Sequence, residues 1–186
     1  MPFRHVHDRF PERIDFAPAG HGPFTGTVAD WPLWFIAHDF DVSTYSTYGC
    51  KVRYGNYRID ESDDELQSSS EALGSKYPDN MTAGWGPIPN FPPPAIVNWR
   101  SKDGTPHEAE IDIGEIFKDM LIRHHVARED IPEGISIGST DIILEVNDKT
   151  INLYTRTFIP LKKPRFPDKP NSDYRDDLIK VFSRTY

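Results

Sequence analysis

Five prolines fall within the eight residues PIPNFPPP, positions 87–94. Each proline fixes φ and lacks a backbone N–H, so this stretch must be extended and cannot be a central strand. With 17 prolines and 12 glycines in 186 residues, the chain favours short strands joined by turns over long helices. Strand-forming residues resume at 95–100, which favours a stiff lead-in to a strand; the alternative is a proline-rich ligand for an aromatic groove.

Apolar runs and alternating patterns predict the remaining strands. Residues 31–40, WPLWFIAHDF, indicate a buried strand, and residues 50–59 a half-buried strand that bulges or turns at Gly55-Asn56. Two hairpins are expected, one over 95–100 and 107–113 and one over 141–147 and 151–159. Residues 178–182 fit a closing strand or a short helix. The charged segment 61–75 is expected to be a solvated, mobile loop.

One helix is predicted, over about residues 113–124. Its apolar residues recur at helical spacing and form a single stripe: Ile113, Ile116, Phe117, Met120 and Leu121. Asp112 is placed to cap it, with Glu115 three residues later. We therefore expect an α+β, β-rich fold, mainly an antiparallel sheet or sandwich with this helix packed on it. Residues 1–30 are expected to form an irregular arm carrying Phe10, Phe16 and Phe24, and residues 31–186 a single domain.

The formal net charge of −8 repels phosphate backbones and anionic lipid headgroups, so nucleic acid and membrane surfaces are poor expectations. Membrane insertion is not expected either, because nowhere do about 18 apolar residues occur together. A cationic protein surface is a better match, although such a charge also simply keeps a protein soluble. The single cysteine, Cys50, excludes an internal disulfide and a cysteine-based zinc site. No basic stretch followed by an apolar run opens the sequence, so a cytoplasmic protein is expected, or a periplasmic one if an export signal has been removed.

Three carboxylates, on Glu108, Glu110 and Asp112, alternate along one strand face. Neighbours on such a face lie about 7 Å apart, too far to chelate one ion, so a solvated face or an acidic patch for a basic partner is favoured over a metal site. The acids of the charged loop, Asp63, Asp64 and Glu65, are candidates for electrostatic steering of that partner.

Two aromatic residues in the Gly/Pro-rich stretch, Trp85 and Phe91, are candidate anchors for a protein partner; the alternative is that both cover the core. Cys50 lies in a strand pattern and is interpreted as a buried apolar residue rather than a nucleophile. The sequence has no Gly-x-Ser-x-Gly elbow, no phosphate-binding glycine loop and no His-Glu-x-x-His helix. We expect no enzyme, no catalytic residue, no cofactor and no metal.

Three blocks carry a resemblance: PIPNFPPPAIVNWRSKDGTPHEAEIDIGEIFKD, DIILEVNDKTINLYTRTFIP and YRDDLIKV. They resemble a family of small bacterial proteins that are encoded beside type VI secretion spike and phospholipase effector genes and are similar to lipase-immunity proteins. The resemblance covers about residues 31–186. It implies an antitoxin that binds a cognate toxic effector and occludes it, and it carries over no catalytic residue. The alternatives are an adaptor that loads an effector onto the secretion spike and a metal-dependent hydrolase.

Overall fold

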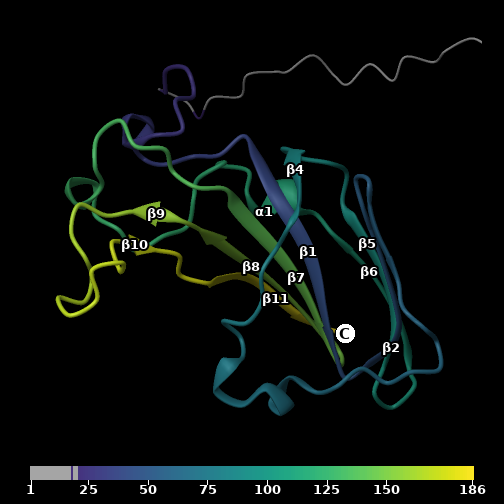
Figure 1. Ribbon diagram of the computed structural model, residues 1–186. Helices are drawn as coiled ribbons and strands as arrows, with labels where there is room; N and C mark the ends of the chain where they lie inside the picture. Colours follow the sequence, from purple (N-terminus) through teal and green to yellow (C-terminus); the bar gives the residue numbers. More distant parts are fainter. Residues whose placement is uncertain (1–17, 19–20) are drawn as a thin grey trace, which may run out of the picture.

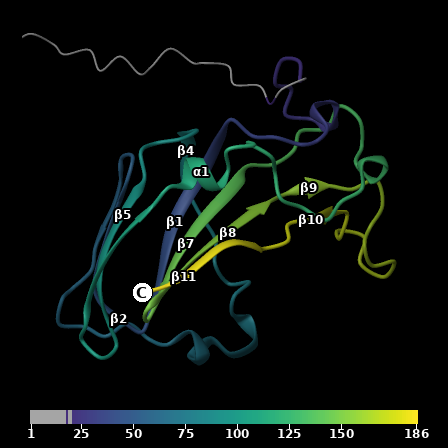
Figure 2. The same cartoon turned by 180° about the vertical axis from the view of Figure 1, so that it is seen from behind.

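The computed structural model describes residue 18 and residues 21–186, which form a sandwich of two β-sheets (Figures 1 and 2). The strands are β1 (Ala37–Tyr45), β2 (Thr47–Tyr54), β3 (Tyr57–Asp60), β4 (Trp85–Pro89), β5 (Ala95–Ser101), β6 (Pro106–Ile111), β7 (Thr140–Asn147), β8 (Thr150–Thr157), β9 (Ile159–Pro160), β10 (Tyr174–Arg175) and β11 (Ile179–Thr185). The helical segments are η1 (Val28–Asp30), η2 (Ser70–Lys76), α1 (Ile113–Ile116) and η3 (Arg128–Asp130).

The two sheets differ in pairing. The five-stranded sheet has the order β11-β8-β7-β1-β4, and only β1 and β7 in it are parallel. The four-stranded sheet, β3-β2-β5-β6, is entirely antiparallel, and β9 and β10 form a separate ribbon. The chain passes from β1 into β2 at Ser46, whose positive φ of 53° turns the backbone between the sheets.

The main core lies between the sheets. Phe40, Leu144 and Leu153 enter it from the five-stranded sheet, and Val97 and Trp99 from the four-stranded sheet. A second, smaller cluster covers the opposite face of the five-stranded sheet, where Ile143 and Tyr154 pack against Met81 of the segment that precedes β4. The central strands β7 and β8 are therefore buried on both faces, which accounts for the nearly continuous apolar run in β7.

The β-rich class is confirmed, as are both hairpins and the closing strand, β11. The proline-rich run is extended, and its first part forms β4 at the edge of the five-stranded sheet. In the 95–113 hairpin, the alternation is as predicted: Ala109 and Ile111 are buried, whereas Glu108 and Glu110 are exposed. Gly55-Asn56 forms the turn between β2 and β3 rather than a bulge.

The strand predicted over residues 31–40 is wrong in its first half. Residues 31–36 form no strand beyond one bridge between Trp34 and Leu121, and β1 begins at Ala37. Their backbone groups bond elsewhere: Phe35 N donates to Met120 O, and Leu33 O accepts from Ile122 N. The run of aromatic residues correctly indicates a core segment, but it does not indicate which segment its backbone hydrogen-bonds to.

The helix predicted over 113–124 is also wrong in length, because α1 is a single turn. Asp112 caps it as expected, accepting from Glu115 N at 3.0 Å. Beyond Phe117 the chain turns, Met120 takes a left-handed φ of 59°, and residues 120–122 pair with 33–35 instead of continuing the helix. The apolar stripe still serves burial, since Ile113 and Phe117 are fully enclosed. Tertiary pairing has overridden helical periodicity here.

The segments expected to be irregular are partly built into the domain. Residues 21–30 contain η1 and place Val28 in the core, whereas Phe10 and Phe16 lie outside the described residues. The charged segment 61–75 contains the start of η2 and is tied to the sandwich through Ser46 N, which donates to the carbonyls of residues 67 and 68. Across the described part of the chain, no helix has the length and apolarity to cross a membrane.

Candidate functional site

The predicted acidic patch lies on the outer face of the edge strand β6. Glu108 and Glu110 are exposed there, and Asp112 is occupied as the cap of α1. The patch is one strand wide. Glu108 pairs with the neutral Asn98 on β5, and Asn98 pairs with Lys51 on β2, which lies two strands, or about 10 Å, from Glu108. The outer face of the four-stranded sheet is therefore mixed in charge rather than anionic.

The loop acids Asp63, Asp64 and Glu65 are exposed, and Asp63 reaches this same face. Its carboxylate lies 3.8 Å from Lys51 Nζ, and its carbonyl accepts from the Arg100 guanidinium. The structure thus brings Asp63 toward the β6 acids, with basic side chains between them.

The two predicted anchors lie in different environments. Trp85, on β4, is 51% exposed and packs edge-on against Tyr57 at 6.2 Å between ring centroids. Phe91 packs against the core, between the rings of Phe35 and Phe117 at 5.9 and 6.3 Å. Phe91 therefore covers the core, which was the alternative to a partner anchor. Trp85 is exposed, but it lies on the other sheet from the β6 acids.

His38 and Cys50 are both enclosed. His38 is 1% exposed, and burial lowers its pKa to about 4; its ring nitrogens contact Tyr54 and Asn90. Cys50 is fully buried, and burial together with the charge of Glu61 raises its thiol pKa to about 12. Within residues 21–186 no three His, Cys, Asp or Glu side chains are placed to hold one metal ion.

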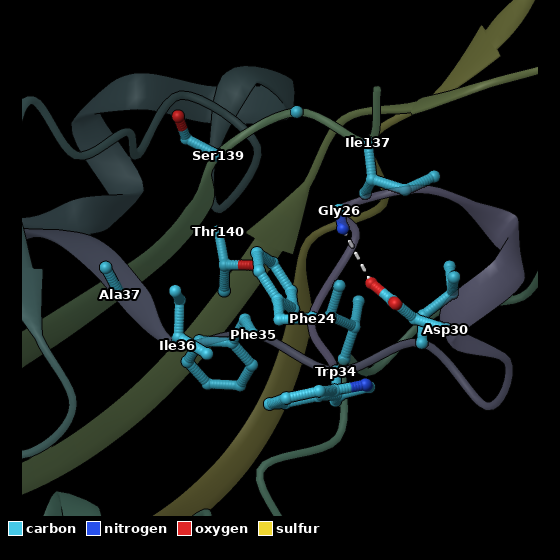
Figure 3. A pocket seen from close by; sticks show the side chains of 13 residues that line it. Phe24, Gly26, Asp30, Trp34, Phe35, Ile36, Ala37, Ile137, Ser139 and Thr140 are labelled. Atoms are coloured by element: carbon cyan, nitrogen blue, oxygen red, sulfur yellow. Dashed lines mark hydrogen bonds between the residues drawn. The ribbon is translucent and has the colours of Figure 1, made fainter. Parts of the chain in front are cut away.

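The feature that stands out is an apolar pocket beside the start of β1 (Figure 3). Its volume is about 210 Å³. In Figure 3 its lining comes from the loop that leads into β1, from the start of β1, and from the segment that leads into β7. The lining includes Phe24, Leu33, Trp34, Phe35, Ile36, Ile122 and Ile137, with Asp30, Ser139 and Thr140 as polar members.

A buried carboxylate shapes one wall of this apolar pocket. Asp30 is 5% exposed and accepts from Thr25 N, Thr25 Oγ1 and Gly26 N at 2.7–2.9 Å. These bonds close the turn that presents Phe24, whose ring packs edge-on against Trp34 at 5.0 Å between centroids. Because all of these partners lie within six residues, the wall is set by local sequence, TGTVAD, and is formed before any ligand arrives.

Backbone hydrogen bonds tie the walls together. Gly26 O accepts from Ile137 N at 2.8 Å, and Phe158 O accepts from Gly138 N at 2.8 Å. The rim is exposed and apolar: Phe24 is 40% exposed and Ile36 42%, and Phe158, which adjoins the lining residue Gly138, is 46% exposed. Of the seven exposed large apolar side chains of the described chain, Phe24 and Ile36 line this pocket, and Phe158 bonds to its lining through Gly138.

Sequence reasoning missed this pocket as a site. The sequence patterns predict an irregular arm around Phe24 and a buried strand around Ile36, and neither prediction points to a common hollow. The usable signal was the run WPLWFIA, which contains more apolar residues than a single strand face can bury. Compared with protein-family models, curated proteins and solved structures, the chain matches none of them.

Proposed function

We propose that this chain is an immunity protein, which binds a toxic type VI secretion effector, a phospholipase, and blocks it sterically. The observation that carries the proposal is the apolar pocket with its exposed apolar rim. Exposed apolar groups concentrated around a concavity mark interaction sites in soluble proteins. The resemblance in the three sequence blocks supplies the class of partner.

The size and lining of the pocket favour a protein partner over a small molecule. Sites for drug-sized ligands usually enclose roughly 300–1,000 Å³, and this pocket is smaller at about 210 Å³. A cavity of that size suits one apolar side chain, the usual anchor at the centre of a protein interface. The rim residues Phe24, Ile36 and Phe158 would then cover the anchor and exclude water.

The pocket is suited to contact rather than chemistry. The one carboxylate in its lining is Asp30, whose oxygens already accept three hydrogen bonds from the turn around it. Occlusion needs a preformed shape, and the walls are fixed by backbone bonds between residues far apart in sequence. A preorganised surface loses little conformational freedom on binding, which supports the tight association that neutralising a toxin requires.

Co-expression tests this proposal. The effector encoded beside this chain is produced in the compartment where it is toxic, with and without the chain, and growth and co-purification are measured. An immunity protein restores growth and co-purifies with the effector. Co-purification without restored growth would contradict immunity and indicate an adaptor. If the two proteins do not associate, the effector is not the partner of this chain.

A further inference from the structure

A second cavity, of about 520 Å³, lies between residues 125–130 and the loop at residues 161–173. Its cationic lining consists of Lys162, Lys163, Arg165 and Arg175. This "basic groove" is unexpected in a chain with a net charge of −8. Two acids, Glu129 and Asp130, also line it, so the lining carries more cations than acids.

Three of the cations are available to a ligand. Lys162, Lys163 and Arg165 are exposed and form no ion pair with any residue from 21 to 186. Arg175 is already engaged, because its guanidinium holds Asp177 at 2.8 and 3.1 Å. The binding capacity of the groove therefore depends on the first three.

The loop that carries these cations is internally braced. Ser172 Oγ donates to Lys169 O at 2.6 Å, and Arg165 N donates to Ser172 O at 2.9 Å. Phe166 is 48% exposed in this loop, with Arg165 and Lys169 each 5.4 Å from its ring centroid. The loop backbone that carries these cations is thus held in place, with an exposed ring next to Arg165, which lowers the ordering cost of binding.

The basic groove adjoins the apolar pocket. Ile122 lines the pocket and Val126 lines the groove, and four residues of chain span at most about 14 Å. On the other side, Phe158 of the pocket rim stacks on Tyr174, the residue before Arg175, at 4.8 Å between centroids. Figures 1 and 2 both place the loop between β9 and β10 toward the same side of the molecule as the loop before β1.

We propose that the basic groove binds an acidic segment of the same protein partner whose apolar side chain enters the pocket. This inference rests on the proposed function for the partner and adds its chemistry: an apolar anchor followed within a few residues by Asp or Glu. Charge complementarity selects an anionic occupant, and the neighbouring apolar pocket favours a peptide over a free anion.

Fluorescent peptides provide the probe. Two 14-residue peptides each carry one Phe, followed in one by four Glu and in the other by four Lys, and anisotropy reports their binding. We expect the Glu peptide to bind more tightly than the Lys peptide. Reversing Lys162, Lys163 and Arg165 to Glu should weaken the Glu peptide roughly tenfold or more, and added salt should reduce that difference.

A matched control separates local from overall charge. Reversing Arg53, Lys76 and Lys102 to Glu makes the same change in net charge at exposed sites outside the groove. This control should leave Glu-peptide affinity within about twofold of the original value. Equal losses in both triple variants, or no preference for the Glu peptide, would overturn the proposal.

Two further outcomes are distinguishable. Binding of phosphatidylglycerol vesicles through the three cations, without peptide binding, would assign the groove to anionic lipid and overturn the proposal. An effector complex that survives the groove reversal unchanged would overturn it while leaving the proposed function intact. Peptide binding without any effector complex would sink the proposed function and, with it, the assignment of the groove to that partner.

Discussion

The imidazole Nε2 of His38 lies 2.9 Å from the hydroxyl of Tyr54, and both side chains are buried beside the sandwich core. On the other side of the ring, Nδ1 lies 2.7 Å from Asn90 Oδ1, while Asn90 Nδ2 donates to Phe35 O. This arrangement assigns the proton to Nδ1 and makes Nε2 the acceptor of the tyrosine hydroxyl. The neutral imidazole thus links β1, β2 and the proline-rich segment.

This link predicts a pH-dependent stability. Burial lowers the pKa of His38 from 6.5 to about 4, so between these values the unfolded chain binds the proton and the folded chain does not. The contribution of His38 is therefore fully present above pH 6.5 and falls, by on the order of 3 kcal/mol, as pH drops toward 4. Urea unfolding at pH 7 and pH 5 measures it.

Asp141 acts in the opposite direction. Burial raises the pKa of Asp141 from 3.8 to about 6, so the folded chain binds its proton more tightly and stability rises as pH falls through this range. In an Asp141→Asn background the acid-side loss should therefore be steeper, and adding His38→Gln should flatten it. A pH profile that His38→Gln leaves unchanged would contradict the assignment.

A buried carboxylate holds the segment before β4 onto the five-stranded sheet. Glu145 is fully buried, and the Tyr77 hydroxyl contacts both of its oxygens at 2.5 and 2.6 Å. Tyr77→Phe leaves the buried carboxylate short of a donor, so we expect a loss of about 1–3 kcal/mol in the free energy of unfolding.

Tyr45→Phe is the control for this prediction, because the Tyr45 hydroxyl only accepts an exposed hydrogen bond from Asn80. Its cost should be below about 1 kcal/mol. Equal costs for the two substitutions, measured by chemical denaturation, would show that the Glu145 contact has no special importance.

The strands could be predicted where two-residue alternation and turn residues agree. In the β5–β6 hairpin, the Asp-Gly turn and the alternation from His107 to Ile111 point to one structure, and that structure is found. The one-turn helix could not be predicted, because what ends it is the pairing of residues 120–122 with a segment some 85 positions earlier. Long-range pairing leaves no local signal in sequence.

The candidate site was harder to predict for a related reason. The apolar pocket is assembled from three segments between residues 24 and 140, and each segment alone resembles ordinary core sequence. Only the fold shows that Phe24 and Ile36 end up on the surface around a common hollow. Charged residues were easier to place because exposure follows directly from alternation, as for Glu108 and Glu110.

The acids of β6 are predicted to affect the rate of effector binding. Glu108→Lys with Glu110→Lys reverses two exposed charges on the outer face of the four-stranded sheet, away from the apolar pocket. We expect slower association, by a few-fold at low salt, with an unchanged dissociation rate and a nearly unchanged melting temperature. Surface plasmon resonance against the effector measures both rates. Equal association rates for the double variant and the original protein would show that these acids do not steer the effector.

The central claim is that the pocket rim forms the contact with the effector. Ile36→Asp introduces a charge at the rim, where the side chain is 42% exposed, and Leu66→Asp makes the same change at a residue that is 40% exposed and outside the pocket. Effector affinity of the two folded variants is the most direct measurement. The account predicts at least a roughly hundredfold loss for Ile36→Asp and less than about threefold for Leu66→Asp; equal affinities would contradict it.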